Sequence, residues 1–477
     1  RLKSSPCPGR PSAAPRGDQF MPTTQSKEND AQLDKLSDER RKRVVRAINW
    51  SIFQSVCQHV ITLQSEPMLV REICQGNVAR SAQMLANTQG LVGLLGLFVN
   101  QAGGKFSDAL GRKPGLLLGP ICNIIIGQLV FNNPGNSLLV LVCRVIRMAA
   151  TTFSNTVICS AAFADLLQGE QLAMAMSTTG AITGLAIILT PFFETLILQR
   201  TKNPRYTYLA LSIMASVQLL INILYTPETL PAAKKVAVES VMKLRTFNPF
   251  GFVEIFRSGS QALQKMVSIN TLQMFLEGKN LSDIVEIWKR EHLKWSITGS
   301  RNFVMVYGTL CVVSGVSITP LFLKNLSARG FTTATNLMNL AGFLIRGAAE
   351  LPWLFMFSVI FMLPGVNGTS SYAIKAICAD RASKEKFGRG EFSAWVNNLR
   401  AIAGSLAPVL YGNYYAWARR RGVSPGTVFW LAALVGAVLP EAILWGTTDA
   451  ELRRELPAPA SSGAKQGDAA PAEKATK

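Results

Sequence analysis

Charged residues are scarce in this sequence of 477 amino acids. Asp, Glu, Lys and Arg together make up 16% of the chain, whereas hydrophobic residues make up 48%. Soluble globular proteins carry about 25% charged residues, so the composition argues against a soluble protein of several domains. A deficit of charge beside an excess of apolar residues is typical of long segments buried in lipid. We therefore expect an integral, multi-pass membrane protein.

Signatures of metal sites and nucleotide-driven enzymes are also missing. The eight cysteines form no C-x-x-C pair, and Cys57, Cys143 and Cys159 lie inside apolar runs, where cysteine behaves as a small hydrophobe. The two histidines, His59 and His292, do not form a metal-binding motif. No G-x-x-x-x-G-K-[ST] loop is present, which excludes a P-loop ATP-driven pump. We expect no metal, no cofactor and no enzymatic activity.

Positive charge, in contrast, is abundant, and the formal net charge is +20. In a soluble protein this charge would suggest a nucleic-acid partner. Here Lys and Arg gather in short connections between apolar runs, as they do on the cytoplasmic side of membrane proteins. Basic runs on the opposite side, at Arg200 to Arg205 and Arg419 to Arg421, weaken this orientation without reversing it. We expect both termini in the cytoplasm and no nucleic acid bound.

Twelve apolar segments are long enough to cross a bilayer, since about 20 helical residues span its hydrocarbon core. All are expected to be helical, because backbone groups in lipid must be hydrogen-bonded internally. The segments cover residues 46–65, 82–102, 114–133, 137–159, 172–196, 206–226, 260–280, 300–323, 331–348, 351–377, 391–415 and 426–446.

The predicted fold class is an all-α integral membrane protein with about twelve transmembrane helices in two six-helix bundles. The bundles are separated by a basic, cytoplasmic linker, and the charged part of the N-terminal tail is expected to form a solvated helix over residues 26–43. The predicted domains are an N-terminal tail with a disordered start, a first bundle, the linker, a second bundle and a disordered C-terminal tail, over residues 1–43, 44–226, 227–259, 260–447 and 448–477.

A polar run from Gly104 to Lys113 (GKFSDALGRK) joins the second and third segments. Asp108 is an anion at a helix end that can pair with Arg112 or meet another helix N-terminus, and Gly111 permits a tight turn. The run matches the G-x-x-x-D-x-x-G-R-[KR] loop of the major facilitator superfamily at every fixed position. The chain resembles that family over about residues 44–447.

The resemblance implies a transporter that works by alternating access. In the family this loop is a cytoplasmic latch between the two halves, which implies a latch of Gly104, Asp108, Gly111, Arg112 and Lys113. The second-half counterpart, at residues 324–330, lacks the acid, so a one-sided latch is expected.

Two further signals accompany the loop. Asp165 after the fourth segment and Asp380 after the tenth form an acidic echo, as expected of two repeated halves. Thr226-Pro227-Glu228 after the sixth segment resembles a run of sugar porters and of tetracycline-resistance-like members, and the latter group is the more similar.

Ionisable residues inside membrane helices are candidates for function, because their burial is costly. Arg144 and Arg147 lie three residues apart on the fourth segment, so they share a face, and Arg147 falls near mid-bilayer. We expect at least one of them to face a central cavity, with snorkelling to the interface as the alternative.

Other polar residues at spanning depth complete the candidate substrate site. The resemblance implies a cavity lined by the first, fourth, seventh and tenth helices, and packing roles between helices remain the alternative for each residue. The candidates are Gln54, Gln58 and His59 on the first segment, Gln273 on the seventh, Asn367 beside a break at Pro364-Gly365 on the tenth, and Arg400 on the eleventh.

Two expectations concern carboxylates and the membrane surface. We expect no carboxylate at mid-depth on the first, fourth or tenth helix, which favours an anionic solute or a facilitative mechanism over proton coupling. The charged segment from Leu281 to Trp295 carries an apolar stripe and is expected to lie along the outer interface.

Three functions stay open on the sequence alone. The first is a monomeric carrier for a small solute, in the bilayer, with protons as a candidate coupled ion. The second is a drug/proton antiporter similar to the tetracycline-resistance group. The third, from another class, is a membrane sensor or scaffold that transports nothing.

Overall fold

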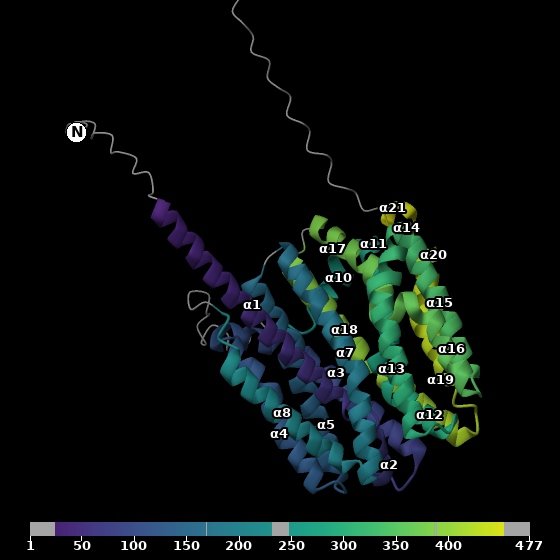
Figure 1. Cartoon of the computed structure of the whole chain (residues 1–477). Helices are drawn as coiled ribbons and strands as arrows, with labels where there is room; N and C mark the ends of the chain where they lie inside the picture. The colour runs from purple at the N-terminus through teal and green to yellow at the C-terminus, as the bar shows by residue number, and fades with distance from the viewer. Residues whose placement is uncertain (1–23, 168, 231–247, 386, 388, 453–477) are drawn as a thin grey trace, which may run out of the picture.

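The helices of this chain form two groups that lie side by side. A computed structural model of the protein describes residues 24–167, 169–230, 248–385, 387 and 389–452. The remaining parts of the predicted tails and linker, residues 1–23, 231–247 and 453–477, lie outside the described residues. In Figure 1 the first half of the chain is purple to teal and the second half is green to yellow. The described part therefore has the predicted all-α architecture of two helical bundles.

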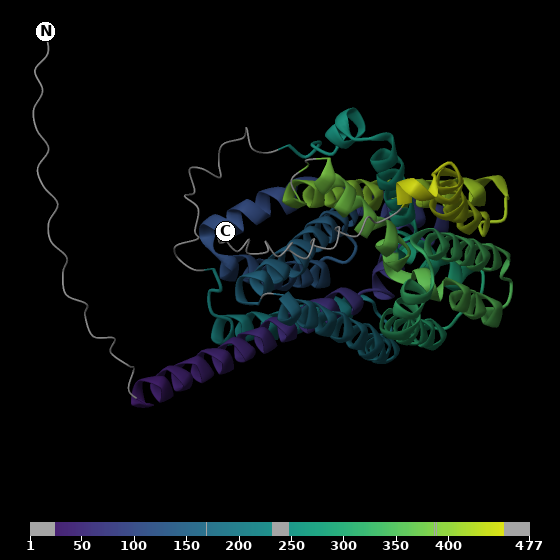
Figure 2. The same ribbon diagram turned by 90° about the horizontal axis from the view of Figure 1, so that it is seen from above.

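The first half begins with a long helix that joins the charged tail segment to the first predicted span without a break. Figure 2 shows this helix running out beyond the rest of the bundle. The elements are α1 (Thr24–Val60), α2 (Ser65–Ile73), α3 (Val78–Leu110), α4 (Arg112–Asn132), α5 (Ser137–Thr152), a π-helical segment (Phe153–Ile158), α6 (Cys159–Leu166), α7 (Gly169–Thr201) and α8 (Arg205–Tyr225).

The second half contains more breaks within its spans. Its elements are α10 (Val253–Ser258), α11 (Gln261–Gln273), a 3-10 turn (Met274–Leu276), α12 (Gly278–Glu291), α13 (Ile297–Val313), a π-helical segment (Ser314–Ile318), α14 (Thr319–Asn325), α15 (Ala328–Ala348), α16 (Pro352–Met362), a 3-10 segment (Leu363–Ser371), α17 (Tyr372–Lys384), α18 (Arg389–Arg421), α19 (Thr427–Ala433), a π-helical segment (Leu434–Val438), α20 (Leu439–Trp445) and α21 (Asp449–Leu452).

Six helical stretches among the described residues are long and apolar enough to cross a membrane. The other spans carry charges, as α5 does with Arg144 and Arg147, or are interrupted, as at the 3-10 segment that follows α16. The six stretches are Val78–Val99, Arg112–Asn132, Ala181–Thr201, Arg205–Tyr225, Ile297–Asn325 and Thr427–Trp445.

The segment from Leu281 to Trp295 does not lie along the interface, so that prediction was wrong. Its first part continues the seventh span as α12, and Leu281, Ile284 and Trp288 are buried in the hydrophobic core. The charges that suggested a surface location are satisfied inside, because Glu286 pairs with Lys289 at 2.6 Å. A helix whose polar face is neutralised internally does not need water on that face.

The two halves meet where α3 packs against α18. At Gly93 an added Cβ would lie 2.5 Å from the backbone nitrogen of Ser405, so only a glycine allows this approach. Gln83 of α3 donates to Asn413 of α18 at 2.8 Å, further toward the α2 end of the same helices. Figure 1 shows α2 and α12 at the end of the molecule opposite to α21 and the start of α1. The halves are therefore in close contact toward that end.

We predict that Gly93→Ala weakens the contact between the halves. The new methyl group meets backbone atoms of α18, which cannot turn away as a side chain can, so the cost should be about 1–3 kcal/mol. Thermal unfolding of the purified protein in detergent should show the loss. A cysteine introduced at Gln83 should also react faster with a membrane-impermeant maleimide in the Gly93→Ala background.

The matched control is Gly315→Ala. Its added Cβ would meet nothing within 4 Å, so stability and labelling should stay at the wild-type level. Equal behaviour of the two variants would contradict the close approach at Gly93.

Candidate functional site

The first span is interrupted after Val60, and the interruption positions an acidic residue. Residues 61–64 form a turn, and α2 starts at Ser65. The N-terminal amides of a helix have no partners within it. Here the Oε1 atom of Glu194, on α7, accepts hydrogen bonds from the backbone N–H groups of Gln64 and Ser65, both at 2.8 Å. Glu66, in the first turn of α2, is thereby held inside the first half.

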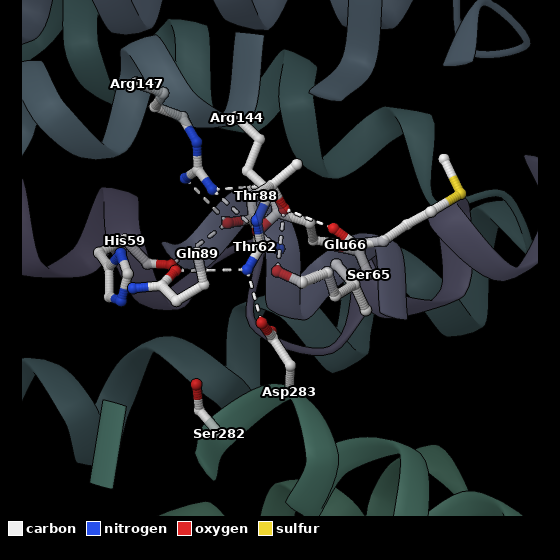
Figure 3. Close-up of polar contacts among 12 residues, drawn as sticks. His59, Thr62, Ser65, Glu66, Thr88, Gln89, Arg144, Arg147, Ser282 and Asp283 are labelled. Atoms are coloured by element: carbon white, nitrogen blue, oxygen red, sulfur yellow. Dashed lines mark hydrogen bonds and ion pairs between the residues drawn. The ribbon is translucent and has the colours of Figure 1, made fainter. Parts of the chain in front are cut away.

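Glu66 is the centre of a buried charged cluster (Figure 3). Its Oε2 lies 2.8 Å from Nη1 of Arg144, and its two oxygens accept hydrogen bonds from Nη2 of Arg147 at 3.0 and 3.1 Å. The hydroxyl of Tyr208 donates to Oε1 at 3.0 Å, and Arg147 also donates to Thr62 at 3.0 Å. One carboxylate thus holds both arginines of α5 in fixed orientations.

The cluster continues across the interface between the halves. Nη2 of Arg144 lies 2.6 Å from Oδ2 of Asp283, which belongs to α12 of the second half. Gln89 accepts a longer hydrogen bond of 3.5 Å from the same Nη2. Arg144 therefore pairs with one carboxylate from each half, as Figure 3 shows. Such buried pairs are strongly destabilised when one partner is removed, because a charge is left in a poorly solvated place.

A second charged group lies on the second half. Glu277, just before α12, pairs with Nε of Arg400 on α18 at 2.7 Å and with Lys279 at 3.3 Å. The sequence-predicted Arg400 is therefore held by an acid from the seventh span. Its side chain remains 46% exposed, so it is available to a ligand.

The candidates on the first helix have different surroundings. His59 is exposed, and Gln54 is half-buried with its Oε1 atom unpaired. Gln58 is fully buried, donates to Gln218 of α8 at 2.6 Å and accepts from Asn123 of α4 at 2.7 Å. Gln58 is thus bound within its own half.

The candidates on the seventh and tenth helices, Gln273 and Asn367, lie in different environments. Gln273 is buried and donates to Asn336 of α15 at 2.8 Å, and Asn336 in turn donates to Glu441 of α20 at 2.9 Å. The break predicted at Pro364-Gly365 is present as the 3-10 segment after α16. Asn367 lies in that segment, and its side chain is outside the described part of the structure.

Sequence reasoning missed the carboxylates of the central cluster. The expectation of no acid at mid-depth on the first, fourth or tenth helix did not anticipate Glu66, which sits one residue beyond the predicted end of the first span. The signal was readable, since Ser65-Glu66-Pro67 has the small polar residue, acid and proline typical of a helix start. Asp283 gave no such signal, because its role depends on a partner in the other half.

The loop between α3 and α4 gathers three acids around Arg112. Nη1 of Arg112 lies 2.7 Å from Asp108, and its Nε lies 2.9 Å from Asp165 after the fourth span. Glu228, after α8, accepts from the backbone N–H groups of Arg112 at 2.8 Å and of Lys113 at 3.2 Å, which caps α4.

Two further contacts explain the glycine and the lysine of this loop. Gly111 has φ +106°, a conformation that favours glycine, and an added Cβ would collide with the Glu228 carboxylate. Lys113 donates its Nζ to the carbonyl of Ile223 at 3.0 Å. Burial raises the pKa of the Glu228 carboxyl, but backbone N–H donors outweigh burial, so its pKa lies below the usual value. Gly104 lies within α3.

Metal binding finds no support in the described ranges, where no group of three or more His, Cys, Asp or Glu side chains is placed to hold an ion. What the central cluster can do chemically is exchange partners. A guanidinium that pairs with two carboxylates can lose one of these partners in two ways. A mobile oxyanion can displace one carboxylate from the guanidinium, or one carboxylate can take up a proton.

We predict that Glu66→Gln strongly destabilises the protein. The change leaves Arg144 and Arg147, whose side chains are 1% and 3% exposed, without their shared carboxylate. Removing one partner of a buried pair costs about 3–5 kcal/mol, which thermal unfolding in detergent should detect. The double variant Glu66→Gln/Arg147→Gln should recover part of the loss, because one uncompensated cation is removed.

Glu72→Gln serves as the control, since Glu72 is exposed on the same short helix and should tolerate the change. A Glu66→Gln protein as stable as the control would show that the cluster does not depend on this carboxylate.

Known proteins with this architecture are solute transporters. The human organic anion transporter MFSD10 (TETRAN) has a TM-score of 0.59 and 16% identity, covering 85% of this chain and 99% of that chain. A D-xylose-proton symporter has a TM-score of 0.60 and 14% identity, covering 84% and 96%. A POT family transporter in complex with 5-aminolevulinic acid has a TM-score of 0.63 and 12% identity, covering 84% and 95%. At these identities the likeness concerns the fold.

Sequence comparison places the chain more firmly. A comparison with curated proteins found no match. The family model of the Major Facilitator Superfamily, however, matches residues 72–408, which is more than half of the chain. The apolar spans, the two helical halves and this match agree that the chain is a multi-pass membrane protein that transports solutes, and that it belongs to the Major Facilitator Superfamily.

Proposed function

We propose that this protein carries a small anionic solute across a membrane by alternating access. The two halves, over residues 44–226 and 260–447, would rock about a central site that contains Arg144 and Arg147. The linker over residues 227–259 and both tails would lie on the cytoplasmic side. The single observation that carries this proposal is the sharing of Arg144 between Glu66 of its own half and Asp283 of the other half.

A shared arginine couples solute binding to movement of the halves. Movement of α12 away from α5, which opening at that end requires, would break the Arg144–Asp283 contact. An anionic solute that takes the place of Asp283 would keep the guanidinium compensated during the movement. Without such a replacement the opening would leave one hydrogen-bonding edge of a buried cation without a partner. Solute binding would thereby favour the switch.

The state seen here supports an outer side that is closed. Cross-half contacts gather toward the end that holds α2 and α12: Arg71 pairs with Glu291, and Gln199 donates to Thr298 at 3.0 Å. We propose that this end faces away from the cytoplasm.

The balance of charge favours an anion over a cation. The central cluster and the group around Glu277 together contain five basic side chains and three carboxylates, so these two groups carry excess positive charge. The basic residues are Arg144, Arg147, Lys279, Lys375 and Arg400, and the acids are Glu66, Glu277 and Asp283. The fold is also that of a human organic anion transporter, which agrees with this class without establishing it.

Proton-coupled antiport of a drug is the second candidate. The sequence had argued against it for lack of a central carboxylate, and the positions of Glu66 and Asp283 remove that objection. Protonation of either acid would release Arg144 from one partner, which is one way to couple a proton to the switch. Flux that follows an imposed pH gradient would favour this candidate, and flux that needs no gradient would favour a facilitator. A sensor or scaffold would show no flux.

We predict that Arg147→Ala reduces transport by about tenfold or more, because loss of a charged contact in a desolvated site costs a few kcal/mol. Uptake of radiolabelled succinate, citrate and phosphate into proteoliposomes would measure it, with and without a pH gradient. The variant should still be recovered in the membrane fraction, since Arg144 continues to compensate Glu66.

Arg200→Ala is the matched control, because Arg200 is an exposed arginine at the end of α7. Wild-type uptake by Arg147→Ala, with Arg200→Ala also unchanged, would exclude Arg147 from the transport site.

A further inference from the structure

Two cations on the second half share one acid, and a third lies within electrostatic range of that acid. Lys279 of α12, Lys375 of α17 and Arg400 of α18, called here the basic triad, are exposed although their helices belong to the bundle. Glu277 compensates two of them, through Oε1 to Arg400 and Oε2 to Lys279. Lys375 is within electrostatic range of both Glu277 and Arg400 and makes no ion pair among the described residues. The triad therefore holds two positive charges more than its own acid neutralises.

Two members of the triad, Lys279 and Arg400, lie beside the surface that meets the first half. Lys279 Nζ lies 3.8 Å from where a Cβ on Gly404 would be, and Gly404 is one helical turn beyond Arg400 on the same face of α18. The backbone of Gly404 is itself in contact with Gly93 of the first half. One turn beyond Lys279 on α12, Asp283 reaches Arg144. Lys279 and Arg400 are thus continuous with the central cluster along the surface where the halves meet.

Without a bound anion, the excess positive charge of the triad is energetically unfavourable. Like charges that share one site repel each other, more strongly where the dielectric is low. The side chains of Lys279 and Arg400 remain 50% and 46% exposed, so water now solvates them. An oxyanion that entered would replace this water with two or three charge-assisted hydrogen bonds, for which the planar fork of Arg400 is well shaped.

We propose that the basic triad binds an oxyanion group of the transported solute, a carboxylate, sulfonate or phosphate, and that the solute carries at least two negative charges. This inference rests on the proposed transport function and assigns the solute's charge and its contacts. Glu277 acts as an internal substitute for the solute, occupying Arg400 and Lys279 while the site is empty. A solute of two or more negative charges matches the excess of the triad, whereas a monoanion leaves one charge uncompensated.

The proposed role of Glu277 predicts opposite changes in anion affinity for two kinds of variant. Removing a cation of the triad should weaken binding of an anion, whereas Glu277→Gln removes a competitor and should strengthen it. A purely structural ion pair predicts instead that variants on either side of the pair only lose stability. The measurement is therefore the concentration of anion that half-saturates stabilisation, and not the stability of each variant alone.

The experiment uses the full chain, purified and reconstituted in phosphatidylcholine vesicles, with thermal unfolding followed against acetate, succinate, citrate and glucose. Succinate and citrate should raise the unfolding midpoint of the wild type, and acetate and glucose should not. Arg400→Gln, Lys279→Gln and Lys375→Gln should each need about tenfold or more succinate or citrate for the same effect, and Glu277→Gln should need less. Arg400→Lys, which keeps the charge, should recover most of the binding.

Arg419→Gln is the control, because Arg419 is an exposed arginine on the same helix, at its far end. If Arg400→Gln fails to fold, Lys375→Gln keeps the test, since no described ion pair is broken there. Equal anion dependence in the wild type and the triad variants, with succinate still transported, would overturn the triad and leave the proposed function intact.

Two other outcomes would contradict different parts of the hypothesis. If none of the anions binds or is transported, the proposed anionic solute is itself wrong. A triad effect that appears only in vesicles containing phosphatidylglycerol would identify a lipid headgroup, not a solute, as the occupant and would overturn the inference.

Discussion

Two arginines buried on one face of α5 must be compensated, and the structure around them follows from that need. Glu66 can serve both only because the first span breaks after Val60 and restarts at Ser65. Glu194 supports the restart by capping the new helix, and Tyr208 orients the carboxylate. Nη2 of Arg144 is not engaged by Glu66, and it pairs with Asp283 of the other half. A local requirement for charge balance thus becomes a contact between two bodies that can move.

Each half is held together by a matching polar network, which explains why two predicted ligands lie elsewhere. Gln58 joins α1 to α4 and α8, and Gln273 joins α11 to α15 and through it to α20. These helices are the first, third and sixth spans of their respective halves, as expected of two parallel repeats. Hydrogen bonds between apolar helices lock the spans of one half against each other.

The loop between α3 and α4 also makes its described contacts within the first half. Three acids that are distant from one another in sequence contact Arg112. They are Asp108, Asp165 and Glu228, and all three belong to the first half or its end. The three sequence signals, which looked separate, are therefore one site. It ties together the ends of four spans of the first half.

The sequence by itself determined the membrane character, the helical fold and the family, and it singled out Arg144 and Arg147 as residues to examine. Each of these depends on composition, on a contiguous motif or on spacing within one helix, which are local properties. It could not determine which polar residues face the centre, because Gln58 and Arg400 look alike in an apolar run and differ only in what packs against them. Nor could it pair Arg144 with Asp283 or group Lys279 with Lys375, since those residues are distant in sequence. Only the tertiary structure decided these partners, because a buried charge is defined by the whole set of helices that surrounds it.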